Sequence, residues 1–473
     1  MKMLVSILLL CMVVFGALLL RDPGIDQRTI TALSIGFLML GAWLTGRLFA
    51  GIKLPRISGY LLFGMLVGPS LWALGAESLL PAVVLEKLQR GTPLISSAQV
   101  VDLRFIKYLA ISLIAITAGG EIHLDWLLKQ GKRIAALTLA NVLGVAGLVF
   151  GVCWALHGVL PVIRTDEAMT TMQLVIAYGF LGLIASGNSP SVAIALINEC
   201  RADGPLSRTT LAVTVCKDLT IIVFFAALIS VGKGLLDEQT AISATFLLAV
   251  GAQLGGSILL GALLGLVMAW FVEHVRGHLV FFVVVSCFLF ALLGEQKFHM
   301  PGTDQHIHLE PLLMALAAGL TMRNFRPKRS EPLFKTIEEM SLPVYCLFFA
   351  VAGAELDLSV FAVASAALAA GIVVVVRAVG VWAVVTWTGK RLGLEPEWRG
   401  KLWLALTPQA GVTLALATLV VQSFAGSPWA GALGNLLLGL VAVHAMAGPI
   451  AYRWALVSSG EAGKMAKSGS IGH

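Results

Sequence analysis

Three ionisable residues lie inside apolar stretches of this sequence, where charges are rare. Lys217 and Asp218 are adjacent in the middle of the segment 206–232, and Arg377 lies in the middle of the segment 359–387. A carboxylate at the depth of a bilayer is costly unless it is paired or hydrated, so its presence there indicates a site for an ion or a proton. We therefore take Asp218, Lys217 and Arg377 as the candidate ion-binding and proton-coupling residues.

The chemistry of such a site is competition at a buried carboxylate. An ionised Asp218 binds either a monovalent cation or a proton, and exchange is coupled if only the occupied site crosses the membrane. With all three groups ionised the site carries a net charge of +1, which repels a cation. Lysine loses its proton in a desolvated site more readily than arginine. We expect Lys217 to carry the exchanged proton and Arg377 to stay charged; the alternative is a structural Lys217–Asp218 ion pair that occupies the site.

The composition predicts the class of protein that surrounds these charges. Of the 473 residues, 58% are hydrophobic and only 12% are charged. Apolar runs of membrane-spanning length recur throughout, which predicts an all-α polytopic membrane protein with about 13–14 transmembrane helices. The predicted spans are 2–20, 29–49, 56–74, 105–122, 134–158, 173–197, 207–231, 240–273, 278–296, 309–323, 341–357, 359–387, 399–422 and 429–453.

The distribution of Lys and Arg predicts the topology. If Met1 is cytoplasmic, the loops placed inside contain more Lys and Arg than those placed outside, with basic clusters in 323–335 and 390–401. The sequence therefore predicts a multi-pass protein of the plasma (inner) membrane with a cytoplasmic C-terminus. The run 2–20 is either a cleaved signal peptide or a retained helix, and the lack of a small-residue cleavage site before Arg21 favours the helix.

Other function classes find little support in the sequence. No metal-ligand pair, nucleophile constellation or phosphate loop is present, so we expect neither an enzyme nor a cofactor or metal site. No basic stripe interleaved with aromatic residues indicates a nucleic-acid partner. The expected partners are the lipid bilayer, a monovalent cation and protons. One outer loop gathers acids and imidazoles without metal-ligand spacing, and we expect it to be a wetted loop: His299, Asp304, His306, His308 and Glu310.

A short motif occurs twice with opposite predicted orientation. The sequence Ala-Gly-Gly-Glu-Ile-His-Leu at 118–124 recurs as Ala-Gly-Ala-Glu-Leu-Asp-Leu at 352–358. The first copy closes a span on the assigned cytoplasmic side and the second on the outer side, as an inverted repeat requires. The motif acids Glu121 and Glu355 lie at span ends, where they are either funnel or gate residues or solvated helix ends.

Three spans follow each copy, and the middle one is interrupted both times. The interruptions are 185–191 and 407–411, each of which contains a proline that removes a backbone donor. Broken helices expose carbonyls and half-helix ends that could coordinate a cation near the middle of the membrane, whereas a pair of packing kinks is the plainer interpretation. The residues expected to act as broken-helix ligands are Asn188, Ser189, Pro190, Thr407, Pro408 and Gln409.

Together these motifs resemble the monovalent cation:proton antiporters, the group that contains the Kef-type and sodium/proton exchangers. The resemblance covers roughly residues 29–453, and only the combination of motifs is specific. The motifs are 54–64 with 68–70, 119–121, 204–208, Pro190, 317–320 and 377–380.

The resemblance implies the antiporter fold, in which an inverted repeat with two crossed broken helices moves like an elevator against a dimerisation domain, and it implies a homodimer. Asp218 matches the family's ion-binding aspartate, and Arg377 matches its basic residue before the second broken helix. Lys217 departs from the pattern, because electrogenic members usually have Asp there and electroneutral members usually have Asn. Residues 408–410 also depart from a turn that contains Gly and Glu in Kef-like relatives.

The domain organisation that follows has a core and a scaffold, each built from both halves. The expected divisions are an extra N-terminal helix (1–28), scaffold helices of the first half (29–133), core helices of the first half (134–232), a linker helix (233–277), scaffold helices of the second half (278–358), core helices of the second half (359–456) and a disordered cytoplasmic tail (457–473).

The sequence thus predicts a secondary active transporter that exchanges Na⁺ or K⁺ for protons by an elevator-type mechanism centred on Asp218. Two alternatives stay open. An anion-conducting transporter would use the net positive charge at the middle of the membrane, and a non-transporting membrane sensor or scaffold would have its ion site occupied by Lys217.

Overall fold

The chain folds almost entirely into long helices. The computed structural model describes residues 27–69, 95, 103–121, 124–163, 165, 168–236, 244–275, 279–299, 306–356, 361 and 363–465. The helices are α2 (Gln27–Gly51), α3 (Arg56–Val67), α7 (Arg104–Glu121), α8 (Leu124–Leu156), α9 (Thr171–Ala185), α10 (Pro190–Cys200), α11 (Pro205–Leu236), α12 (Ala244–His274), α13 (Leu279–Glu295), α14 (Pro311–Phe325), α15 (Pro327–Glu355), α16 (Ala364–Arg391), α17 (Pro396–Ala405), α18 (Gly411–Ser423) and α19 (Pro428–Ser458).

The all-α prediction is confirmed, with one small exception. Each predicted span from 29–49 onward coincides with one helix or with one pair of half-helices, whereas the run 2–20 lies outside the described residues. The exception is an antiparallel hairpin of β1 (Lys297–His299) and β2 (His306–His308). It forms part of the loop that the sequence placed on the outer side.

Length and composition identify membrane-crossing helices directly. Seven stretches of the described residues are long and apolar enough to cross a bilayer, or eight if a bent pair within α15 counts as one span. The bend in α15 is 53° and lies between Ile337 and Leu342. Pro343 follows the bend, and the carbonyl four residues before a proline loses its hydrogen-bond donor, which kinks a helix.

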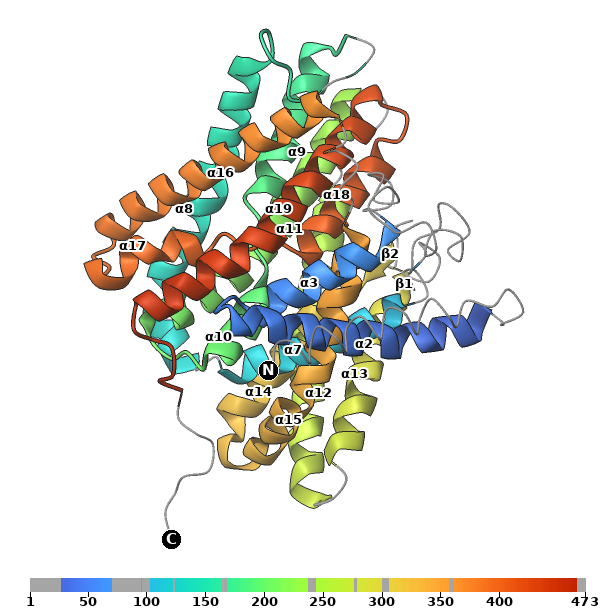
Figure 1. The fold of residues 1–473 in the computed structure, drawn as a ribbon, viewed down its shortest axis with the longest axis vertical. Coiled ribbons are helices and arrows are strands. Elements are labelled where there is room, and N and C mark those ends of the chain that lie inside the picture. Colours follow the sequence, from blue (N-terminus) through green and yellow to red (C-terminus); the bar gives the residue numbers. More distant parts are fainter. Residues whose placement is uncertain are drawn as a thin grey trace.

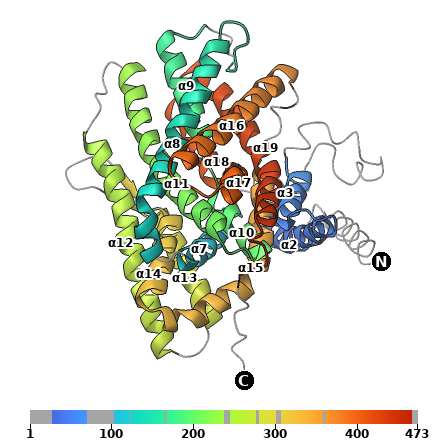
Figure 2. The same cartoon turned by 90° about the vertical axis from the view of Figure 1, so that its left-hand side faces the viewer.

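The helices form two groups that lie side by side. In one group α8 packs against α9, α11 and α16, and α19 packs against α16, α17 and α18. In the other, α14 packs against α7 and α12, and α15 packs against α3 and α7. Figure 1 shows α8 and α16 running alongside one another, and Figure 2 shows α2 and α3 on one side of the molecule with α12 on the opposite side.

Glycines of the repeated motif bring helix backbones into contact twice. A Cβ on Gly119 of α7 would lie 2.0 Å from the Leu316 carbonyl oxygen of α14, and a Cβ on Gly353 of α15 would lie 2.2 Å from the Leu61 carbonyl oxygen of α3. Only glycine permits so close an approach. The two copies of the motif therefore make equivalent contacts, α7 with α14 and α15 with α3, as expected for an inverted repeat.

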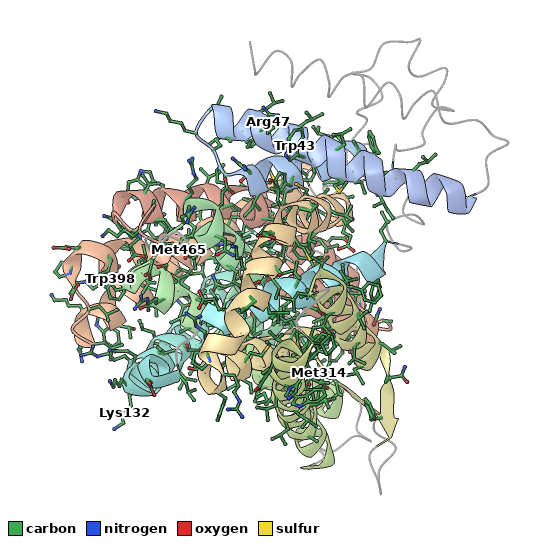
Figure 3. The ribbon with its side chains drawn as sticks, turned by 90° about the horizontal axis from the view of Figure 1, so that it is seen from below. Trp43, Arg47, Lys132, Met314, Trp398 and Met465 are labelled. Atoms are coloured by element: carbon green, nitrogen blue, oxygen red, sulfur yellow. The ribbon has the colours of Figure 1, made fainter. Side chains whose placement is uncertain are left out.

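Three helices carry an aromatic–basic pair near their C-terminal ends. The Arg47 guanidinium lies 4.8 Å from the Trp43 ring centroid on α2, where Figure 3 shows both side chains. On α16 the Arg391 guanidinium lies 4.7 Å from the ring centroid of Trp387. The third pair stacks Trp270 on His274 in α12. All three helices end on the side that the topology assigns to the cytoplasm.

The tail predicted to be disordered from residue 457 is ordered over its described part. Helix α19 continues to Ser458, and the next residues bind the turn between α10 and α11. Gly463 N donates to the Cys200 carbonyl oxygen at 2.9 Å, and Met465 N donates to the Arg201 carbonyl oxygen at 2.9 Å. Residues 457–465 are therefore ordered, and 466–473 lie outside the described residues.

Glu461 is the physical reason for this order. Its side chain is 3% exposed, and its two carboxylate oxygens accept hydrogen bonds from Leu206 N at 2.6 Å and Ser207 N at 2.8 Å. These amides belong to the first turn of α11, and Gly204, the residue before the helix, has no side chain to cap them. The tail thus supplies the N-terminal cap of the helix that carries Lys217 and Asp218.

Candidate functional site

The two interrupted spans meet in the middle of the first helix group. Helix α9 ends at Ala185 and α10 begins at Pro190, while α17 ends at Ala405 and α18 begins at Gly411. Ser189 N donates to the Pro408 carbonyl oxygen at 2.9 Å. The Asn188 side-chain amide donates to the carbonyl oxygen of Leu406. The predicted broken helices are therefore present and cross at their breaks.

Arg377 joins the two breaks through their free carbonyls. The fully buried guanidinium on α16 donates to the carbonyl oxygens of Ala185 at 2.6 Å, Gly187 at 2.8 Å and Thr407 at 3.1 Å. These carbonyls lie at the C-terminal ends of α9 and α17, where the helix dipole places negative partial charge. The ends of two helices thus stabilise the charge of Arg377, and its role as a fixed charge at the ion site stays a prediction.

Gln409 reinforces the same junction from the second break. Its buried amide nitrogen lies 3.3 Å from the Ile184 and Ala185 carbonyl oxygens and 3.2 Å from that of Gly187. Its Oε1 atom is buried and has no hydrogen-bond partner among the described residues. The carbonyls that the sequence offered as cation ligands are therefore engaged by Arg377 and Gln409 in this conformation.

The other expected broken-helix ligands have local partners. Ser189 caps α10, its Oγ accepting from Val192 N at 3.3 Å and lying 3.0 Å from Ser191 Oγ. Thr407 Oγ1 donates to the Trp403 carbonyl oxygen at 3.0 Å. Pro190 stands at the start of α10, where its missing N–H costs nothing.

Lys217 points into the core and away from its neighbour in the sequence. The ammonium group is fully buried and donates to the side-chain oxygens of Asn141 on α8 and Asn188 at the first break. Within the part of the chain that the structure describes, no ion pair joins Lys217 to Asp218. Successive helix residues are rotated by about 100°, which lets the two side chains face different neighbours. The Lys217–Asp218 ion pair, which the sequence left open as an alternative, is therefore absent from the described structure.

The Asp218 carboxylate is buried but lacks partners. Its side chain is 5% exposed, and Oδ2 has no hydrogen-bond partner among the residues described. The charged groups that act on it electrostatically are Lys217 and Glu310. A buried carboxylate with unused lone pairs is an open position for a cation or a proton.

Glu310 lies deeper than its place in the sequence suggested. The sequence assigned it to a wetted outer loop, yet its backbone N–H donates to Ser257 Oγ at 2.9 Å, and Ser257 is fully buried in the middle of α12. Strand β2, which comes directly before α14 in the chain, packs on α12. Of the other residues of that loop, His299, His306 and His308 lie in the hairpin, and Asp304 lies outside the described residues.

The structure also places the remaining candidates and adds two residues that sequence analysis missed. Glu355 ends α15 and is half-buried, while Glu121 ends α7, and its side chain is outside the described set. His444 of α19 is buried, hydrogen-bonds the Leu440 carbonyl oxygen through Nδ1 at 2.9 Å, and lies within electrostatic reach of Arg377. Asn141 and His444 are lone polar residues within apolar spans, a signal that could have revealed both.

Comparisons with known proteins agree with this geometry. The family model described as "Sodium/hydrogen exchanger, transmembrane" matches residues 35–457. The sodium proton antiporter MjNhaP1 from Methanocaldococcus jannaschii, in its structure at pH 8, superposes with a TM-score of 0.63 at 16% identity over 92% of this chain and 99% of that one. A second structure of MjNhaP1, determined by electron microscopy, gives a TM-score of 0.67 at 15% identity over 92% and 98% of the two chains. No curated protein sequence matches significantly.

Proposed function

Because the chain belongs to the transmembrane sodium/hydrogen exchanger family, a family of transporters rather than enzymes, we propose that it exchanges Na⁺ or K⁺ for protons by alternating access centred on Asp218. One observation carries the proposal. Asp218 Oδ2 is buried without a hydrogen-bond partner among the described residues, beside a junction of two broken helices. Neutral side chains and carbonyls near it are already bonded to one another, so Asp218 is the open anionic position.

The contacts of Lys217 support its role as the proton carrier. A neutral amine has two N–H bonds and one lone pair, whereas an ammonium has three N–H bonds. Two amide oxygens, from Asn141 and Asn188, accept from Lys217, and the nearby charge of Arg377 opposes a second cation. The surroundings therefore satisfy the neutral amine, and Lys217 gives up its proton when a cation binds at Asp218.

Polar contacts between the two helix groups support an elevator motion. Glu199 of α10 accepts a hydrogen bond from Arg56 N at the start of α3 at 2.8 Å, and Asn198 Nδ2 donates to Tyr345 Oη of α15 at 3.3 Å. Arg453 of α19 donates to the Lys53 carbonyl oxygen before α3. All these contacts lie at the assigned cytoplasmic end, so they close that side, and a moving core must break them.

Cross-linking tests the motion. In a background without the native cysteines, Asn198→Cys with Tyr345→Cys joined by a short bifunctional thiol reagent should stop exchange, and each single cysteine variant treated alike should stay active. Full activity in the joined protein would rule out a motion of α10 against α15.

Proton flux in proteoliposomes tests the proposed function. Gradients of Na⁺, K⁺, Li⁺ and choline are imposed on wild type, on Asp218→Asn and on the control Asp203→Asn, which changes an exposed acid paired with Arg208 at 2.9 Å. We expect cation-dependent proton flux in wild type and control, and its loss in Asp218→Asn, because an amide cannot bind either ion by charge.

The other outcomes discriminate the remaining interpretations. An anion-conducting transporter predicts that Asp218→Asn retains flux while Lys217→Gln abolishes it. A sensor or scaffold predicts well-folded wild-type protein without flux of any kind. Either result would overturn the exchange of cations for protons at Asp218.

The surroundings of the site complete the proposal. The Trp43–Arg47 and Trp387–Arg391 pairs lie where aromatic and basic residues anchor a helix at a membrane interface, which supports a cytoplasmic C-terminus in the plasma (inner) membrane. We assign the scaffold to the group of α7, α14 and α15 and the core to that of α8, α11 and α16, and we expect a homodimer through the scaffold. Light scattering of the detergent-solubilised protein measures the dimer directly.

A further inference from the structure

We propose that Glu310 is a second carboxylate of the ion site, which faces Asp218 from the scaffold and strengthens cation binding there. This inference rests on the proposed function, since it assigns a further specificity-determining residue to the same exchange. The sequence placed Glu310 in a wetted outer loop, whereas in the structure Glu310 is half-buried and its backbone bonds to the buried Ser257 in the middle of α12.

The first argument is depth. Asp218 lies about 20 Å from the start of α11 and about 27 Å from its end, at 1.5 Å per residue. Ser257, which holds the backbone of Glu310, lies about 20 Å from the start of α12 and about 26 Å from its end on the same measure. Both residues lie within the membrane-crossing stretches of their helices, 205–229 and 251–274, about 20 Å and 26 Å from the ends that the topology assigns to the cytoplasm, and α11 packs against α12. The start of α14 thus brings Glu310 to within about one helical turn of the level of Asp218.

The second argument is the orientation of the Lys217 side chain. The Lys217 ammonium is occupied by Asn141 and Asn188 on the core side, so it leaves Asp218 Oδ2 unpartnered. Glu310 is the other charged group within electrostatic reach of Asp218 among the described residues. Two carboxylates that face one another without a bonded cation between them attract a positive ion.

The third argument is the balance of charge. Asp218, Lys217 and Arg377 alone sum to +1, which opposes a cation. With Glu310 included the sum is zero when Lys217 is protonated. The sum is again zero when Lys217 has released its proton and a monovalent cation has bound. Glu310 therefore lets one proton be replaced by one cation without a net buried charge.

The fourth argument is rigidity. Helix α14 packs backbone-to-backbone on α12, because a Cβ on Gly261 would lie 2.3 Å from the Met314 carbonyl oxygen, and one on Gly265 would lie 2.5 Å from that of Ala318. Glu310 is thus fixed to the scaffold, whereas Asp218 belongs to the core. The two carboxylates cooperate only in the conformation in which α11 lies against α12, and cation affinity differs between the two sides of the membrane.

Cation titrations in proteoliposomes test the role of Glu310. Glu310→Gln should raise the cation concentration for half-maximal exchange about tenfold, the effect of removing one nearby charge, with the maximal rate within about twofold of wild type. Glu310→Asp should restore part of the affinity because it restores the charge. The control Glu397→Gln removes an exposed acid from the first turn of α17 and should behave as wild type.

The outcomes separate this inference from the proposed function. Wild-type half-saturation in Glu310→Gln, beside an inactive Asp218→Asn, overturns the role of Glu310 alone. An equal loss of maximal rate in Glu310→Gln and Glu310→Asp overturns it too, because only a structural role would reject both. If the glutamine variant does not fold, half-saturation of Glu310→Ala decides, and a wild-type value there refutes the inference because alanine also removes the charge. A wild type without cation-dependent exchange overturns both proposals.

Discussion

The two broken helices share one architecture but differ in what their polar residues bind. At the first break, Asn188 accepts a hydrogen bond from Lys217, an ionisable group. At the second, Gln409 donates to backbone carbonyls of the first break. The first break thus communicates with the ion site, and the second holds the first in place. The two breaks thus have similar backbones, and their side chains bind different partners.

The helices that follow the breaks show the same division. Helix α11, after the first break, carries the adjacent pair Lys217 and Asp218 at its middle. Helix α19, after the second, carries His444, whose Nδ1 bonds to the Leu440 carbonyl oxygen of its own helix. On the proposed function, the first half supplies the groups that exchange ions, and the second supplies support through Arg377 of α16.

Arg377→Met should produce the largest effect, because it removes the group shared by both breaks. Three carbonyl oxygens lose a donor: those of Ala185 and Gly187 keep the Gln409 amide, whereas that of Thr407 keeps no donor among the described residues. A buried polar group left unpaired costs about 1–3 kcal/mol, so the variant should lose about that much stability and all exchange activity. Thermal unfolding in detergent measures the loss. Arg377→Lys keeps the charge but lacks the planar guanidinium, so its melting temperature should lie between those of wild type and Arg377→Met. A melting temperature of Arg377→Met equal to that of wild type would contradict the joining role.

Lys217→Gln should have the second-largest effect, on pH dependence rather than on folding. The glutamine amide still donates to Asn141 and Asn188 but cannot titrate. In wild type, a lower pH on the cation side protonates Lys217 and opposes the cation, so the half-saturating cation concentration should rise by up to about tenfold per unit of pH. In Lys217→Gln this rise should disappear, as flux titrations at several pH values measure.

The second break provides the matched control for that experiment. Gln409→Ala removes a buried amide that binds only backbone carbonyls, so it should lower thermal stability by about 1–2 kcal/mol and leave the pH dependence unchanged. A Lys217→Gln protein with wild-type pH dependence would refute Lys217 as the proton carrier. Loss of pH dependence in Gln409→Ala would refute the division between the breaks.

The sequence predicts the helices well and the directions of side chains poorly. Apolar length alone specifies the spans, and Pro190 and Pro408 mark both breaks because proline cannot donate within a helix. The direction of Lys217 depends on partners from α8 and the first break, which lie far apart in the chain. The different neighbours of Lys217 and Asp218 therefore follow only when these segments are placed in the fold.

Glu310 and Glu461 show why some tertiary contacts could not be predicted from the sequence. Both lie next to polar stretches that resemble solvated loop or tail, yet each bonds to a distant helix. The half-buried Glu310 bonds through its backbone to Ser257, and the buried Glu461 carboxylate bonds to the first amides of α11. Composition reports the average surroundings of a segment. It does not report an individual tertiary hydrogen bond.

Glu461→Gln should have the smallest effect, and it tests whether the two halves are linked at their ends as well as at their breaks. The Glu461 carboxylate follows α19 of the second half and caps α11 of the first, where a negative charge at a helix N-terminus contributes about 0.5–2 kcal/mol. The amides of Leu206 and Ser207 should exchange with deuterium about fivefold faster in the variant.

Gly204→Ala reaches the same contact from the other side and sharpens the result. A Cβ at Gly204 would lie 2.4 Å from the Glu461 carboxyl carbon, so alanine displaces the carboxylate without changing any charge. Gly400→Ala is the control for this variant, because a Cβ at Gly400 would meet no atom within 4 Å. Gly393→Ala is unsuitable as a control, because Gly393 adopts a positive φ of 68° that strains any side chain. If Gly204→Ala and Glu461→Gln both leave exchange at Leu206 unchanged, the tail does not hold α11. The ion site would then depend on the crossed breaks alone for its support.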